Sequence, residues 1–174
     1  MTWNIDAAHS HVTFAVRHMM VATVRGKFNV LRGTLNLDQA NPANSWVEAE
    51  ADAASIDTSE PNRDKHLRSA DFFDVDKYPK ITFKSTKVEP VRDNEYKVTG
   101  DLTMHGITKP VVFDVEHSDE IKDPFGFRRV GLSAKSKISR KEWGLTWNQL
   151  LETGGAIVSD EVKLEIDVSA VTKA

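Results

Sequence analysis

Along most of the chain, apolar and polar residues alternate by two, the spacing that places successive side chains on opposite faces of a β-strand. Val12, Phe14 and Val16 share one face of such a segment, whereas His11 and Thr13 lie on the other. The same pattern recurs in segments 9–16, 47–53, 81–83, 96–104, 111–115, 130–138 and 162–168. Each segment has the length of a strand, with one dry and one wet face.

Segment 27–37 breaks this regularity, because its apolar positions are even at Phe28 and Val30 but odd at Leu31, Leu35 and Leu37. Such a slip predicts a bulge that bends the strand and turns the sheet back on itself. Turn-forming residues separate the patterned segments at 41–44, 89–94, 123–126 and 154–155. The pattern therefore predicts about eight strands joined mainly as hairpins.

Two stretches depart from the strand pattern. Thr58 or Ser59 is expected to cap a short helix through residue 68, with Pro61 in its first turn. Trp143, Trp147 and Leu150 repeat at helical spacing, although Gly144 is equally compatible with a loop or a single turn. Neither stretch is long enough to connect parallel strands, so we predict an all-β, eight-stranded antiparallel barrel with one or two short helical turns.

Composition narrows the classes of function. A chain of 174 residues is expected to form one domain, residues 1–174, and the lack of cysteine excludes disulfides and Cys-ligated metals. The net charge of −3 without a basic run argues against nucleic acid as a partner. No stretch approaches the roughly 20 apolar residues of a membrane span, so an integral membrane protein is not expected. No signal peptide is visible at the start, which makes the cytoplasm the expected location.

Motifs for catalysis and metal binding are sparse. His9 and His11 share a strand face, but no third ligand converges on them, so we expect outward-facing histidines and no metal. The sequence has no His-Glu-x-x-His, Gly-x-Ser-x-Gly or glycine-rich phosphate loop, and Asp101 with His105 does not by itself make a catalytic pair. No catalytic residue and no cofactor are therefore predicted.

The mixed-charge segment 63–67 is followed by Asp71-Phe72-Phe73-Asp74. It is interpreted as a surface turn with a phenylalanine plugging one end of the barrel. Alternatively, charges at a barrel mouth would meet a polar head group. Small residues on the apolar face, Ala49, Ala51 and Ala134, leave open whether the interior is a filled core or a ligand tunnel.

The ordered set of short motifs resembles one known family, the YceI family of polyisoprenoid-binding, lipocalin-like bacterial proteins. The motifs are Trp3-x-Ile5-Asp6, His9-Ser10-x-Val12-x-Phe14-x-Val16-Arg17-His18, Gly26-x-Phe28, Gly33, Ser55-Ile56-x-Thr58, Arg63-Asp64-x-His66-Leu67, Asp71-Phe72-Phe73-Asp74, Tyr78-Pro79, Phe83-x-Ser85, Gly100-Asp101-Leu102-Thr103-x-x-Gly106, Ser139-Arg140, Trp143-Gly144 and Ser159-Asp160-Glu161-Val162. The resemblance covers nearly the whole chain and rests on the order of the motifs.

The resemblance implies a barrel whose apolar pore holds a long isoprenoid, either a polyprenyl lipid or an isoprenoid quinone, for transport, storage or scavenging. It implies no catalysis, and it is the only basis for expecting a homodimer. The secretion signal of periplasmic relatives is not seen, and His11 gains no support as a metal ligand.

The predicted ligand-binding residues follow from position along the strands. The expected wall comprises Phe14, Val16, Phe28, Phe83, Leu102, Met104, Phe113, Leu132 and Ile138. Phe72 and Trp147 are expected near an opening, with His18 and Arg63 at the head-group end. An alternative is an enzyme that acts on a hydrophobic or quinone-like substrate with His105 or His66 as acid or base. A third hypothesis is a fully packed barrel without a tunnel.

Overall fold

The computed structural model describes residues 1–148 and 157–173. Over these residues, twelve β-strands form one sheet. The strands are β1 (Thr2–Ile5), β2 (His11–His18), β3 (Ala22–Phe28), β4 (Leu31–Asn36), β5 (Trp46–Asp52), β6 (Ile56–Asp57), β7 (Lys80–Arg92), β8 (Glu95–Met104), β9 (Ile107–His117), β10 (Ile121–Lys122), β11 (Phe127–Ser139) and β12 (Glu161–Lys173).

Three pairs of short strands are the halves of bent strands. β12 pairs with β1 near Ala170 and with β2 between Lys163 and Asp167, so β1 and β2 form one side of the same ladder. β4 and β3 likewise pair with β1 and β2, and β5 and β6 pair with β4 and β3. With β11 paired to β12 the sheet closes on itself. The predicted eight-stranded antiparallel barrel is confirmed.

The bend in segment 27–37 is a break in the strand. β3 ends at Phe28 and β4 begins at Leu31, so Asn29 and Val30 lie between them. The expected bulge within one continuous ladder is therefore replaced by an interruption, which allows the two halves to follow the curvature of the barrel. Phe28 and Leu31 are both buried despite their opposite parity, because the interruption resets the alternation.

One α-helix, α1 (Pro61–Arg68), follows β6. The predicted caps, Thr58 and Ser59, are wrong by one or two positions, because the Glu60 carboxylate accepts the backbone N–H groups of Asn62 and Arg63. The hydroxyl of Thr58 is occupied elsewhere, donating to Asp64 at 2.5 Å.

The second helical prediction resolves into a short turn. A 3-10 turn, Arg140–Trp143, ends at Gly144, whose φ of 71° lies in the left-handed region that favours glycine. Leu150 and the expected turn at 154–155 lie outside the described residues. Three further 3-10 turns are Ala7–His9, Pro42–Asn44 and Ala53–Ser55.

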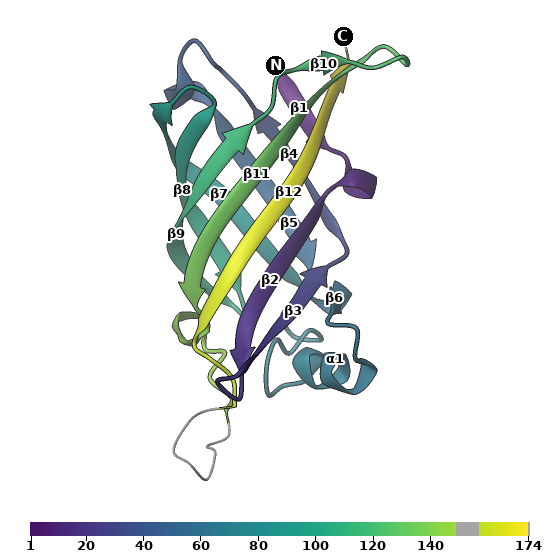
Figure 1. Ribbon diagram of the computed structural model, residues 1–174, viewed down its shortest axis with the longest axis vertical. Coiled ribbons are helices and arrows are strands. Elements are labelled where there is room, and N and C mark those ends of the chain that lie inside the picture. The colour runs from purple at the N-terminus through teal and green to yellow at the C-terminus, as the bar shows by residue number, and fades with distance from the viewer. Residues whose placement is uncertain (149–156, 174) are drawn as a thin grey trace.

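Figure 1 shows a tall barrel whose strands are tilted against its long axis, with both chain termini at one end. α1 and the turn between β2 and β3 lie at the opposite end (Figure 1). We refer to these as the termini end and the α1 end.

Candidate functional site

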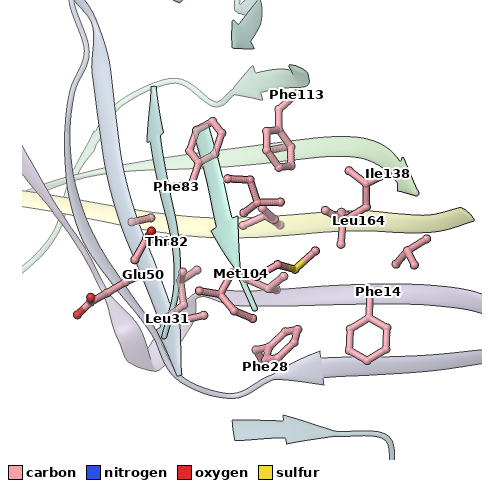
Figure 2. Close-up of a pocket in the computed structure, with 18 of the residues that line it drawn as sticks. Phe14, Phe28, Leu31, Glu50, Thr82, Phe83, Met104, Phe113, Ile138 and Leu164 are labelled. Carbon is pink, nitrogen blue, oxygen red and sulfur yellow. The ribbon is translucent and has the colours of Figure 1, made fainter. Parts of the chain in front are cut away.

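An apolar cavity with a volume of about 580 Å³ occupies the interior of the barrel. Figure 2 shows the rings of Phe14, Phe28, Phe83 and Phe113, together with the thioether of Met104, around this space. Lining residues extend from Asn62 and Trp147 near α1 to residues of the termini end such as Tyr96 and His117. The interior is therefore a long space rather than a filled core.

All of the residues predicted to bind a ligand line this one cavity. They are Phe14, Val16, His18, Phe28, Arg63, Phe72, Phe83, Leu102, Met104, Phe113, Leu132, Ile138 and Trp147. Ala49, Ala51 and Ala134 line it as well. The alternation of each strand fixes which side chains face inward, so the strands converge on a common interior. Ligand contact by these residues stays a prediction.

Two inward-facing glycines allow large rings to lie against the wall. A Cβ atom at Gly26 would lie 2.3 Å from Phe14 Cζ, and one at Gly100 would lie 2.4 Å from Phe83 Cζ. Each ring thus covers the strand at a position where any other residue would displace it. The ring of Phe83 also packs edge-on against Phe113, with a centroid distance of 5.2 Å.

At the α1 end, polar side chains join the lining. The Arg63 guanidinium donates from Nε to the Thr58 hydroxyl and from Nη2 to the Thr58 carbonyl, both at 2.8 Å. His66 Nε2 lies 2.8 Å from Asp71 Oδ2, and its ring packs edge-on against Trp147 and Phe72, at centroid distances of 4.7 and 5.2 Å. The Arg63 guanidinium and the His66 imidazole therefore border the cavity at this end.

Sequence reasoning did not assign a role to Arg140, which is buried and lines the cavity. It donates hydrogen bonds to the backbone carbonyls of Leu145, Trp147, Val158 and Ser159, at 2.6–3.3 Å. Burial lowers the pKa of this guanidinium, while Asp160 at 3.8 Å opposes the shift. An arginine remains charged at neutral pH even so, and it joins two chain segments near the α1 end.

At the termini end, His117 was likewise not predicted, although it continues the inward alternation of Val111, Phe113 and Val115. Its Nδ1 lies 2.8 Å from the Ser118 carbonyl and must donate there, since a carbonyl only accepts. Its Nε2 is buried without a hydrogen-bond partner among the described residues. The ring of Tyr96 stacks on it at a centroid distance of 5.6 Å.

Other candidate residues lie away from the cavity. His9 pairs with Asp6 at 2.8 Å and His11 with Asp167 at 3.5 Å, and both histidines are exposed. Within residues 1–148 and 157–173, no three His, Cys, Asp or Glu side chains group as metal ligands would. His105 is not among the lining residues, and its Nδ1 bonds the Trp143 carbonyl at 2.9 Å. No helix in the described part of the chain has the length and apolarity to cross a membrane.

Comparisons with known proteins agree on one family. A model of the YceI-like domain matches residues 3–170. Protein YceI of Escherichia coli O157:H7 is 38% identical over 166 residues, which cover 95% of this chain and 83% of that protein.

Solved structures share the barrel. BcnA of Burkholderia cenocepacia superimposes with a TM-score of 0.84 at 25% identity, covering 95% of this chain and 98% of that one. A polyisoprenoid binding domain from Saccharophagus degradans, implicated in plant cell wall breakdown, superimposes with a TM-score of 0.69 at 16% identity and covers 97% of both chains. At that identity the second likeness concerns the fold alone.

Proposed function

The chain belongs to the family of YceI-like domains, and on that premise we propose that it binds a long-chain isoprenoid in its barrel. The ligand is a polyprenyl lipid or an isoprenoid quinone, which the protein transports, stores or scavenges. Polyisoprenoid binding is recorded in the name of the Saccharophagus degradans domain, and here it is extended to this chain as a proposal.

The observation that carries the proposal is the long apolar cavity of about 580 Å³. That volume falls within the range of roughly 300–1,000 Å³ typical of small-molecule sites. Most of its lining offers no hydrogen-bonding group, so a bound molecule gains chiefly from burial, at about 0.8 kcal/mol per methylene. Ordering a flexible tail offsets part of this gain. An elongated hydrocarbon with few polar atoms fits these conditions.

The polar head group is assigned to the α1 end. Arg63 supplies a cation there, and His18 and His66 supply imidazole nitrogens. The His66 ring lies beside the aromatic rings of Phe72 and Trp147. No ion pair to a carboxylate engages Arg63 in the described part of the chain. An oxygen-rich head group would therefore find donors at this end while the tail extends toward the termini end.

The alternative of an enzyme has less support in the geometry. An acid or base must lie beside the bound substrate, and His105 does not line the cavity. His66 does, but one of its ring nitrogens is engaged by Asp71. Replacing His105 with glutamine should abolish turnover on the enzyme hypothesis and leave lipid retention unchanged on the carrier hypothesis.

Native mass spectrometry of the gently purified protein tests the proposal, followed by organic extraction of any bound species. We expect a stoichiometric species of isoprenoid mass. Ala49→Phe should block binding, because the new ring fills the cavity, whereas Ala15→Phe adds the same ring at a position that does not line it. An empty protein that also fails to take up added polyprenyl lipid or quinone would overturn the proposal, as would an Ala49→Phe variant that binds like the parent.

A further inference from the structure

The turn between β2 and β3 presents three consecutive apolar side chains to solvent. Met19, Met20 and Val21 are 46%, 66% and 79% exposed. They connect His18 to Ala22, which face each other as the last pair of the ladder. Hairpin turns usually carry glycine, asparagine or aspartate, so an apolar tip gives the isolated fold no evident advantage. We call these three residues the apolar tip.

The backbone of the apolar tip is unusual for its residue types. Met19 and Met20 have φ values of 52° and 62°, in the left-handed region that disfavours most side chains. The remaining non-glycine residues with positive φ in the described chain are polar: Ser59, Asp74, Asn94 and His105. The tip is nevertheless held in place, because Met19 N–H donates to the Ile157 carbonyl at 2.7 Å and Arg17 Nη2 donates to the Met20 carbonyl at 3.2 Å. Hydrogen bonds to the backbone thus hold two exposed methionines in a defined conformation.

The apolar tip lies at the α1 end, where His18, Arg63 and His66 line the cavity. His18, immediately before the tip, lines the cavity, as do Val16 and its cross-strand partner Val24. Figure 1 places this turn at the same end as α1 and opposite both termini. A surface that covers the tip therefore also lies beside this end of the cavity.

The hairpin that carries the tip is cationic. Between Asp6 and Asp38 the sequence contains no aspartate or glutamate, whereas Arg17 and Arg25 project from the exposed face of β2 and β3. In the described residues, neither arginine pairs with a carboxylate. Four other arginines on the outer surface form ion pairs with carboxylates, namely Arg32, Arg92, Arg128 and Arg129, whereas Arg68 bonds backbone carbonyls. Among the described residues, the positive charge beside the tip therefore has no carboxylate partner.

We propose that the apolar tip inserts into the surface of a bilayer containing anionic phospholipids, with Arg17 and Arg25 against the lipid phosphates. Apolar side chains flanked by arginines match the two layers of such a surface, because the apolar side chains meet the acyl chains and the arginines meet the anionic head groups. Docking of this kind brings the α1 end of the cavity to the membrane, where an isoprenoid passes between the two. This use of docking rests on the proposed function, whereas docking itself is measurable without an isoprenoid.

Vesicle flotation tests the contribution of the tip, using vesicles of phosphatidylethanolamine and phosphatidylglycerol. We expect the parent to float with these vesicles, and Met20→Asn with Val21→Ser to weaken binding at least about tenfold, since binding strength follows buried apolar area. Asparagine suits the left-handed backbone at residue 20, so the double variant should fold. Phe125→Ser is the matched control, because Phe125 is an 81% exposed tip residue of the β10–β11 turn at the termini end.

Arg25→Gln tests the charge independently of the tip, because Arg25 supports no other part of the described structure by a hydrogen bond or ion pair. An arginine near an anionic surface contributes about 1 kcal/mol, so a roughly fivefold weaker binding is expected. Vesicles of phosphatidylcholine alone should bind the parent weakly, and added salt should weaken binding to the anionic vesicles.

The outcomes separate docking from ligand binding. Tip variants that stay loaded with lipid in native mass spectrometry but no longer float, and no longer exchange isoprenoid with vesicles, support the proposal. A parent that does not float overturns it, even when the protein holds an isoprenoid. Equal loss in Phe125→Ser overturns it, because nonspecific adsorption then explains the binding. Sedimentation that shows the tip variants dissociating a dimer also overturns it, since a second copy of the chain then covers the tip.

Discussion

Two arginines at opposite ends of the barrel differ in burial and in the kind of hydrogen-bond partner. At the termini end, Arg129 lies on the surface and pairs with Asp6 at 3.0 Å and Asp123 at 2.8 Å. Near the α1 end, Arg140 is buried and donates its hydrogen bonds to backbone carbonyls such as those of Leu145 and Val158. The Arg129 side chain is 31% exposed and that of Arg140 is 5% exposed, so water solvates the first guanidinium better than the second. The two arginines should therefore contribute different amounts to the free energy of unfolding, although both have hydrogen-bond partners.

The backbone pairing between strands also differs between the two ends of the barrel. β11 and β12 pair without interruption from Phe127 to Ser139. β11 pairs with β9 only over Leu132 to Lys135, so no described backbone pairing joins them farther toward the α1 end. Near this seam the indole of the fully buried Trp143 donates to the Leu102 carbonyl at 2.9 Å. Side chains thus replace backbone pairing at the α1 end, which leaves that end dependent on single residues.

Arg140→Met should have the largest effect on stability. The substitution removes the Arg140 donor from the carbonyls of Leu145, Trp147 and Ser159. The Val158 carbonyl keeps a donor in the Asn148 amide. Each buried group left unsatisfied costs about 1–3 kcal/mol. We expect the free energy of unfolding in urea to fall by about 3–5 kcal/mol in total. Arg129→Met, the matched change at the termini end, should cost less, about 1–2 kcal/mol, because its ion pairs are only partly buried and lie between the exposed and the fully buried case. Equal losses in the two variants would contradict the contrast between the ends.

The cap of α1 should have an intermediate effect. Glu60→Ala removes the carboxylate that accepts the N–H groups of Asn62 and Arg63. Loss of an N-cap typically costs about 1 kcal/mol, which thermal unfolding would register as a lower Tm. Glu60→Gln keeps an acceptor oxygen and should retain most of that stability. Were both variants equally destabilised, charge at the helix start rather than the cap bond would explain the loss.

The smallest effect concerns pH and the ion pairs of the termini end. Hydrogen bonds from His9 and, to a lesser extent, from Arg129 hold the pKa of Asp6 below its usual value. Hydrogen bonds from the Phe127 N–H and from Arg129 lower the pKa of Asp123 in the same way. Carboxylates with a lowered pKa stabilise the fold above the unfolded pKa of about 4, and this stability is lost as the pH falls through the folded value.

Tm should therefore decline as the pH is lowered from about 5 toward 2. Asp123→Asn keeps an acceptor for the backbone N–H groups and removes the charge, so its Tm should depend less on pH over that interval. An equal decline of Tm in both proteins would assign the acid sensitivity to other carboxylates. Glu50 and Asp52 are candidates, because hydrogen bonds from Arg32 lower the pKa of both.

Much of the fold and of the cavity wall could be predicted from the sequence. Alternation in a strand is a local property, so the apolar face that contains Phe14, Phe83 or Phe113 can be predicted without knowing which strands are its neighbours. The same reasoning would have placed His117 on the inward face, two residues beyond Val115. The cap of α1 was missed because Thr58, a better capping residue by type, bonds Asp64 instead of the helix backbone. A sequence pattern does not show which of several possible partners the Thr58 hydroxyl will bond.

The sequence by itself determined which side chains face inward and that the strands close into an antiparallel barrel, because both follow from residue spacing and short connections. Only the tertiary structure decided that the interior holds a cavity rather than a filled core, since that volume depends on the curvature of the whole sheet and on rings that lie over Gly26 and Gly100. It also decided that Arg140 joins two segments and that the apolar tip lies beside the α1 end of the cavity. These contacts are between residues far apart in the chain, and a local sequence pattern does not give the distance between such residues.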